Sequence, residues 1–155
     1  MSDPRLVKLD LDPQSVGAAA SADAEHDRQV AIFDLLETNR FAPADDEGGP
    51  YTLRLAVEDN RLVFDVSGPG YGKRHMLSLT PLMRVMKDYA LVCDSYYEAV
   101  RDATPSQIEA IDMGRRGLHN EGSDLLRQRL EGKIALDHET ARRLFTLIYA
   151  LQRRS

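Results

Sequence analysis

The residues whose types and spacing are best suited to binding or catalysis lie in one tract, DMGRRGLHNEGS at 112–123. On a helix Arg115 and His119 would share one face, four residues apart, and Arg116 and Asn120 would share the next. Two guanidiniums beside an imidazole and an amide are suited to clamp a phosphate or a carboxylate, and the neighbouring glycines would let the ligand approach the backbone. The candidate anion or partner site therefore consists of Arg115, Arg116, His119, Asn120 and Glu121.

The same tract has a catalytic and a structural interpretation. His119 could act as a general acid or base with Glu121 setting its tautomer, although two residues so close on a helix point in different directions. Alternatively, Asp112 and Arg116 have the spacing of an ion pair within one helix. Gly114 and Gly117 would then allow two helices to pack closely. We favour the structural or interface interpretation, because arginines and small residues are common in interfaces as well as in ligand sites.

Other motifs of known chemistry are incomplete. The loop 67–72 resembles a phosphate-binding loop, but Ser67 replaces its first glycine and Arg74 follows its lysine. His138 opens a sequence similar to a HExxH zinc motif, in which Arg142 replaces the second histidine. Cys93 lies in an apolar helical stripe and is predicted to be a core residue. We therefore predict no metal site and no cofactor, and the sequence favours a protein that is not an enzyme.

The tract must be positioned by the elements around it. Residues that alternate between apolar and polar predict strands near 7–11, 51–57, 62–66 and 75–79. Helical spacing and start signals predict helices near 23–39, 81–100, 105–131 and 137–151, and leave open whether 105–131 is one helix or two. The first helix is expected to bury Val30, Ile32, Phe33, Leu35 and Leu36. The second is expected to bury a stripe of Leu82, Val85, Met86, Tyr89, Cys93, Tyr96 and Val100.

This order of elements predicts an α+β fold. A small antiparallel sheet of about four strands would be packed on one face by four or more helices. The length of 155 residues is typical of one domain, so we expect a single domain over 1–155, mostly sheet plus one helix in 1–80 and helical in 81–155.

Charge and composition narrow the range of partners. The net charge of −5 argues against bulk binding to nucleic acid or to anionic lipid. Residues 1–50 carry 11 acidic and 4 basic side chains, whereas 101–155 carry 8 acidic and 10 basic ones, so an anion site is expected in the C-terminal third. No apolar run is long enough for a membrane helix, the first residues do not resemble a signal peptide, and there is a single cysteine. We expect a cytoplasmic protein without a membrane segment.

Five stretches together resemble a known family: AIFDLLETNRF at 31–41, RLVFDV at 61–66, LSLTP at 77–81, ATPSQIEAIDMGRRGLHNEGSDLL at 103–126 and TARRLFTLI at 140–148. The chain is similar over almost its whole length to an uncharacterised protein family of alpha-class proteobacteria. The resemblance implies a small bacterial cytoplasmic protein of unknown function. It carries no established activity, cofactor or site residue to any position of this sequence.

Three functional hypotheses follow. The first is a non-catalytic binding or regulatory protein, a homodimer or the binder of another protein, that uses its helical C-terminal half. It rests on the failure of the catalytic motifs and on helices rich in tyrosine and methionine. The second is an enzyme or sensor for a phosphorylated metabolite or nucleotide through the tract 115–121. The third is RNA binding through the basic C-terminal third, which the acidic N-terminal half disfavours. We adopt the first.

Overall fold

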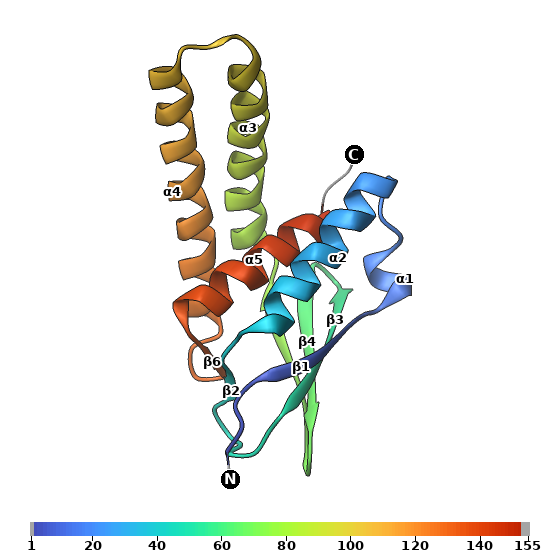
Figure 1. Ribbon diagram of the computed structural model, residues 1–155. Coiled ribbons are helices and arrows are strands. Elements are labelled where there is room, and N and C mark those ends of the chain that lie inside the picture. The colour runs from blue at the N-terminus through green and yellow to red at the C-terminus, as the bar shows by residue number, and fades with distance from the viewer. Residues whose placement is uncertain (1, 153–155) are drawn as a thin grey trace.

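The computed structural model describes residues 2–152 and confirms the α+β class (Figure 1). Its helices are α1 (Pro13–Val16), α2 (Ala22–Glu37), α3 (Thr80–Asp102), α4 (Pro105–Arg129) and α5 (His138–Gln152). Its strands are β1 (Leu6–Leu11), β2 (Phe41–Pro43), β3 (Tyr51–Glu58), β4 (Arg61–Gly68), β5 (Tyr71–Ser78) and β6 (Ile134–Leu136). The tract 105–129 is one continuous helix, which answers the question that its glycines left open.

The main sheet has the strand order β1-β3-β4-β5 and is mixed, so the prediction of an antiparallel sheet was wrong for one strand pair. β3, β4 and β5 form an antiparallel meander, but β1 pairs with β3 in parallel. The reason is the connection: the chain leaves β1, crosses through α1 and α2, and returns to β3 in the same direction. A helical crossover of this kind is what parallel pairing requires. The strands β2 and β6 form a separate antiparallel pair that the sequence analysis missed.

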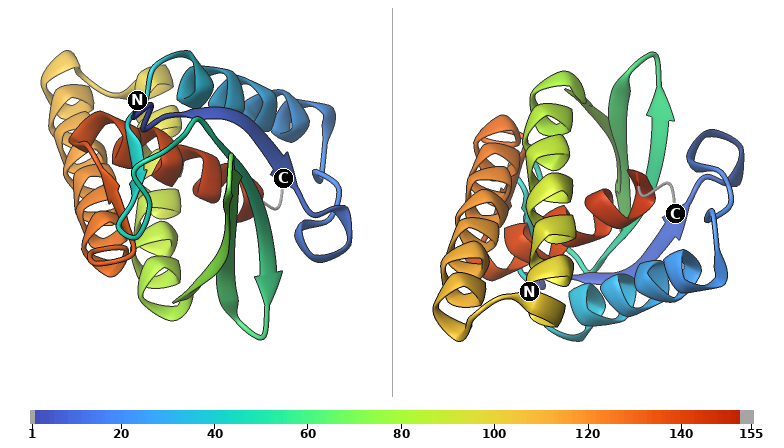
Figure 2. Two further views of the ribbon diagram at one scale, coloured as in Figure 1. Left: turned by 90° about the horizontal axis from the view of Figure 1, so that it is seen from below. Right: turned by 90° about the horizontal axis from the view of Figure 1, so that it is seen from above.

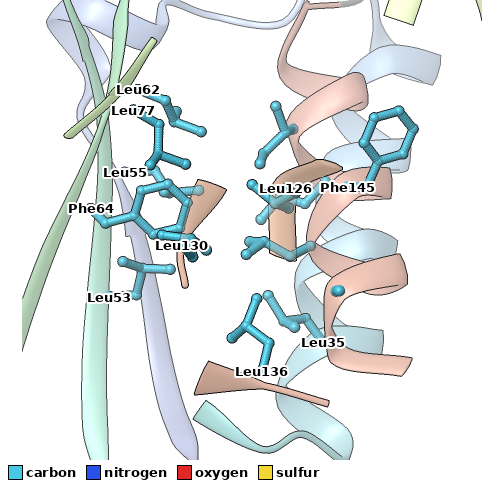
Figure 3. Close-up of a cluster of buried hydrophobic side chains, with 14 of the residues drawn as sticks. Leu35, Leu53, Leu55, Leu62, Phe64, Leu77, Leu126, Leu130, Leu136 and Phe145 are labelled. Carbon is cyan, nitrogen blue, oxygen red and sulfur yellow. The ribbon is translucent and has the colours of Figure 1, made fainter. Parts of the chain in front are cut away.

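The core lies between this sheet and a helical layer formed by α2, α5 and the lower part of α4 (Figure 3). Leu53, Leu55 and Phe64 project from the strands and Leu126 approaches them from α4, whereas Phe145 lies on the helix side of the cluster, farther from the strands. α5 is the most buried helix, as its small polar face predicts, with eight of its residues buried. Asp137 accepts a hydrogen bond from the Thr140 backbone N–H at 2.9 Å and so caps its start.

The face of α2 that enters the core differs from the predicted one. Val30 and Phe33 were expected inside, but 43% of Val30 and 66% of Phe33 is exposed. The buried residues are Ala24, Arg28, Ala31 and Leu35. These four recur every three or four residues, as one helix face must, but their small or charged side chains did not mark that face as apolar.

Helices α3 and α4 form a hairpin that projects from the rest of the molecule (Figures 1 and 2). The 23 residues of α3 span about 35 Å at 1.5 Å per residue. Only its first turns meet the core, where Leu82, Val85 and Met86 are buried. Further along, Cys93 and Tyr96 are half-buried and Val100 is 52% exposed, so the expectation that the whole stripe is core was wrong for its outer half. Within residues 2–152, no helix is long and apolar enough to cross a bilayer.

Candidate functional site

The candidate residues lie on α4 where the α3–α4 hairpin meets the rest of the molecule. We call this contact of α4 with α3 and α5 the joint. The start of α4 is fixed by the predicted capping box. Thr104 Oγ1 accepts from the Gln107 backbone N–H, and the Gln107 side chain accepts from the Thr104 N–H. The helical spacing predicted for the tract is therefore present, with Arg115 and His119 one turn apart.

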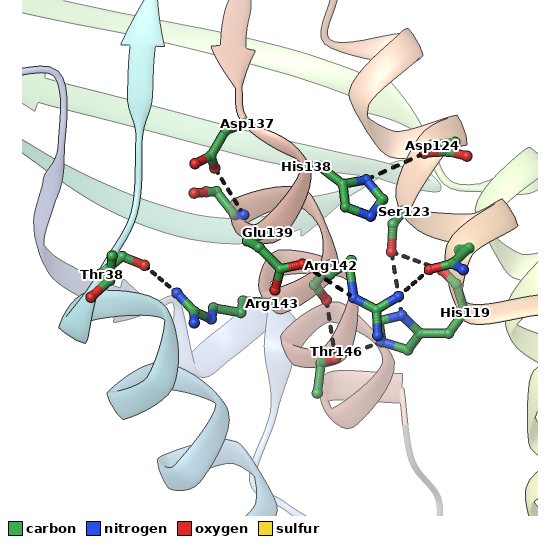
Figure 4. A network of polar contacts seen from close by, with 12 residues as sticks. Thr38, His119, Ser123, Asp124, Asp137, His138, Glu139, Arg142, Arg143 and Thr146 are labelled. Carbon is green, nitrogen blue, oxygen red and sulfur yellow. Dashed lines mark hydrogen bonds and ion pairs between the residues drawn. The ribbon is translucent and has the colours of Figure 1, made fainter. Parts of the chain in front are cut away.

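His119 is buried at this joint and fully engaged (Figure 4). Its Nε2 lies 2.7 Å from the Thr146 hydroxyl, and Ser123 Oγ is 3.4 Å from its Nδ1. Its ring meets those of Tyr89 and Phe145 edge-on, with centroids 5.5 and 5.1 Å apart. Burial, with smaller effects of the Arg142 and Arg115 charges, lowers the pKa of His119 to about 4. The imidazole is therefore neutral near pH 7.

The two arginines of the tract bind the same carboxylate. Arg115 Nη2 lies 2.5 Å from Asp112 Oδ1, and Arg116 Nη2 lies 2.7 Å from Asp112 Oδ2. The expected ion pair between Asp112 and Arg116 is thus confirmed, and Arg115 joins it. The hydrogen bond from Arg115 holds the pKa of Asp112 below its ordinary value. The Arg115 guanidinium also lies over the ring of Tyr96, 4.0 Å from its centroid.

Asn120 and Glu121 have separate environments. Asn120 Oδ1 accepts a hydrogen bond from Arg142 of α5, which ties α4 to α5. Glu121 is exposed, and the partners of the His119 ring are Thr146 and Ser123 rather than Glu121. The structure thus brings Arg115 and His119 to the joint, directs Asn120 to Arg142, and leaves Glu121 in solvent.

This arrangement is better suited to holding helices together than to binding a phosphate. A phosphate at the arginines would have to compete with Asp112, whose carboxylate already binds both guanidiniums at hydrogen-bonding distance. A base with a pKa near 4 is also far from the value near 7 that suits general acid or base catalysis. The anion site on these five residues stays a prediction.

A larger feature beside the joint was missed by the sequence analysis. A groove of about 1170 Å³ runs between α2 and α3, with α5 as its floor. From α3 it is lined by Met83, Met86, Ala90, Cys93 and Tyr97, and Val100 continues the same stripe. These positions are separated alternately by three and four residues, which is the spacing of a seam between two packed helices. The signal was present in the sequence, but the same spacing also describes a helix face buried in its own core.

Cys93 is a half-buried wall residue of this groove rather than a full core residue. Burial raises the pKa of its thiol, so it is a weak nucleophile near pH 7. Both signs of charge occur around the groove: Asp27, Asp34 and Asp94, and Arg84, Lys87 and Arg115. Within residues 2–152, no group of three or more His, Cys, Asp or Glu side chains is placed to hold a metal ion.

The acidic loop 43–50 lies elsewhere and pairs with β5. Asp45 accepts from the Tyr71 hydroxyl at 2.7 Å and from Lys73 Nζ at 2.8 Å. These two hydrogen bonds lower the pKa of Asp45 to about 2. Asp46 accepts from the Tyr51 hydroxyl at 2.6 Å. The negative charge of this loop is thus engaged on the sheet.

Comparison with known proteins agrees with the resemblance noted from the sequence. A protein of Caulobacter vibrioides (strain NA1000 / CB15N) is 60% identical over 147 residues, which is 95% of this chain and 92% of the relative. A Maricaulis maris protein is 60% identical over 158 residues, covering 99% of this chain and 97% of the relative. An Azorhizobium caulinodans protein is 58% identical over 95% of this chain and 93% of its own length. All three carry the name UPF0262 protein.

No solved structure matches the chain. The family description, by contrast, matches from residue 3 to residue 154. On these two lines of sequence evidence, the chain belongs to the Uncharacterised protein family (UPF0262).

Proposed function

We propose that this protein is a non-catalytic binding protein that associates with a second copy of itself through the α3–α4 hairpin and the adjoining groove. The observation that carries the proposal is the seam of apolar residues along α3 from Met83 to Val100, in which Met83, Tyr97 and Val100 are exposed. Seams of this spacing are normally closed by another helix.

The distribution of exposed apolar side chains supports this surface. Among the large apolar residues that are exposed within residues 2–152, Met83, Tyr97 and Val100 lie on the seam of α3. Val30 of α2 borders the same groove. An apolar surface of this kind, rimmed by polar groups, is typical of a protein interaction site.

The open surface of α4 also suits a close helix partner. A Cβ atom at Gly114 or at Gly117 would meet nothing within 4 Å, so no part of the described chain packs against either glycine. The close approach that these glycines would allow is therefore available to a second molecule.

A second copy is favoured as the partner because of the charges. In a twofold contact each surface meets itself, so a surface of one sign would repel its copy. The rim of the groove carries three acidic and three basic side chains, and it is therefore able to complement itself. The phosphorylated-ligand hypothesis is less favoured, because Arg115 and Arg116 already share Asp112.

Sedimentation equilibrium tests the proposal. The unmodified chain should sediment at twice its 17.4 kDa mass. A Tyr97→Glu, Val100→Glu double variant, with both changes at exposed positions, should weaken association by more than about tenfold, because it places unpaired carboxylates in the contact. Ser95→Glu is the matched control: it lies two residues from Tyr97, about 160° away around the same helix.

A monomeric unmodified chain at all accessible concentrations would refute the self-association. Equal dissociation constants for the double variant and the Ser95→Glu control would refute the assignment of the surface.

A further inference from the structure

A second cavity lies away from the hairpin, between α1, the connection 17–21, α2, the end of β3 and the end of α5. It has a volume of about 470 Å³ and is lined by Ser15, Val16, Ala18, Ala20, Arg28, Val57, Leu151 and Gln152. Apart from Ser15, Arg28 and Gln152, these side chains are apolar. The only charged group among them is the guanidinium of Arg28.

Arg28 is unusual because it is 95% buried, with an exposed fraction of 5%, and has no carboxylate partner within residues 2–152. Its Nη1 donates to the Gly17 carbonyl at 2.8 Å, and its Nη2 approaches the Leu151 carbonyl at 3.4 Å. Its Nε–H is buried and finds no acceptor in the part of the chain that the structure describes. Each Nη atom has a second N–H, to which the described residues likewise offer no acceptor.

A buried cation in this state is costly unless an anion accompanies it. Two carbonyls compensate it in part, since the Leu151 carbonyl is at the negative end of the α5 dipole. They leave the formal charge without an anionic partner among residues 2–152. The nearest acid of the α1 segment, Asp12, is already bound to Arg54 at 2.9 Å and to Ser15 at 2.6 Å.

We propose that this cavity binds a small carboxylate with a short apolar body, with Arg28 as the carboxylate-binding residue. The planar fork of a guanidinium matches a carboxylate in geometry and charge. The small apolar walls, Val16, Ala18, Ala20 and Val57, would receive the rest of the ligand. The site is separate from the groove and does not depend on the proposed self-association.

The test uses n-butyrate as the probe and n-butanol, of similar shape but uncharged, as its control. The Arg28 Nε–H resonance, identified by its absence in Arg28→Lys, is followed in a ¹H–¹⁵N spectrum during titration of the full chain. We expect a saturable shift with butyrate and a dissociation constant on the order of 1 mM, as befits a ligand of about six non-hydrogen atoms. Butanol should give no saturable shift.

Two variants make the result specific. Arg28→Lys is checked for folding by circular dichroism and followed through the backbone N–H resonances of Val16 and Ala18, which line the cavity and are present in both proteins. These resonances should show a saturable shift with butyrate in the unmodified chain and none in Arg28→Lys, because lysine lacks the fork. Ala18→Phe leaves Arg28 intact, changes an exposed wall residue and should weaken binding at least about tenfold by filling the cavity.

The proposal is overturned if butyrate produces no saturable shift. It is also overturned if Ala18→Phe binds butyrate as well as the unmodified chain, or if inorganic phosphate binds more tightly than butyrate, since either outcome removes the role of the apolar walls.

Discussion

One methyl group added at Gly122 should destabilise the protein, although it improves the helix. Gly122 is buried on α4, where it faces α5, and a Cβ atom there would lie 2.2 Å from Phe145 Cε1 and 2.4 Å from Cζ. Carbon atoms in contact are normally about 3.5–4.0 Å apart. Phe145 is fully buried, and its ring is held by Tyr89 and His119, so it has little room to move.

Two opposing effects decide whether the free energy of unfolding rises or falls. Replacing glycine by alanine inside a helix contributes about 1 kcal/mol of stability. Overpacking a filled core costs about 1–3 kcal/mol, and an overlap this large against a fixed ring belongs at the upper end or beyond. We therefore expect Gly122→Ala to lower the free energy of unfolding by about 2 kcal/mol or more.

Gly117→Ala is the matched control on the same helix. Its Cβ would meet nothing within 4 Å among residues 2–152 of its own chain. At protein concentrations below the dissociation constant of the proposed dimer, only the gain in helix propensity therefore applies, and the free energy of unfolding should rise by about 1 kcal/mol. Urea denaturation followed by circular dichroism measures both variants. If Gly122→Ala were as stable as Gly117→Ala, the close packing of α4 on α5 at this point would be refuted.

Two further predictions concern His119 and Cys93. Because the pKa of His119 is lowered from 6.5 to about 4, the unfolded chain binds its proton first. Stability should therefore be complete above pH 6.5 and fall by at most about 3 kcal/mol as the pH drops toward 4. In His119→Gln the urea midpoint should depend less on pH over this range. A smaller dependence should remain because burial also lowers the pKa of His75. If the midpoint of the variant depended on pH as strongly as that of the unmodified chain, the burial of a neutral His119 ring would be contradicted. Cys93, in the groove, should be alkylated by iodoacetamide more slowly as protein concentration rises, and a rate independent of concentration would argue against its cover by a second copy.

Local signals were sufficient for much of this fold. The capping residues Thr104 and Asp137 mark helix starts through contacts with residues three positions away, which a sequence displays directly. The alternation in β3 and β4 likewise predicts their pairing. The parallel position of β1 and the pairing of β2 with β6 join residues far apart in the chain, and nothing local to these short strands specifies them.

Burial was harder to predict than helix formation. The spacing along α3 is that of a helix face that packs against something, and spacing alone does not state whether the cover comes from the same chain. The stripe enters the core at Leu82 and leaves it beyond Met86. On α2 the error was of another kind: Arg28 occupies a buried position that pattern reasoning assigns to apolar residues, and Phe33 occupies an exposed one.

The polar residues of α4 account for the angle at which the hairpin projects. In the part of the chain that the structure describes, the outer half of the hairpin packs against no other element (Figure 1), so its orientation must be fixed by contacts at its inner end. Hydrogen bonds, which require a defined geometry, fix the relative position of two helices more precisely than apolar contacts alone. His119 to Thr146 and Asn120 to Arg142 are two such bonds, both joining α4 to α5. Arg115, held by Asp112 and packed on Tyr96, joins α4 to α3 in the same region. The residues that most resemble a catalytic site are therefore engaged in fixing the hairpin, and the surface they hold in place is the one proposed to bind.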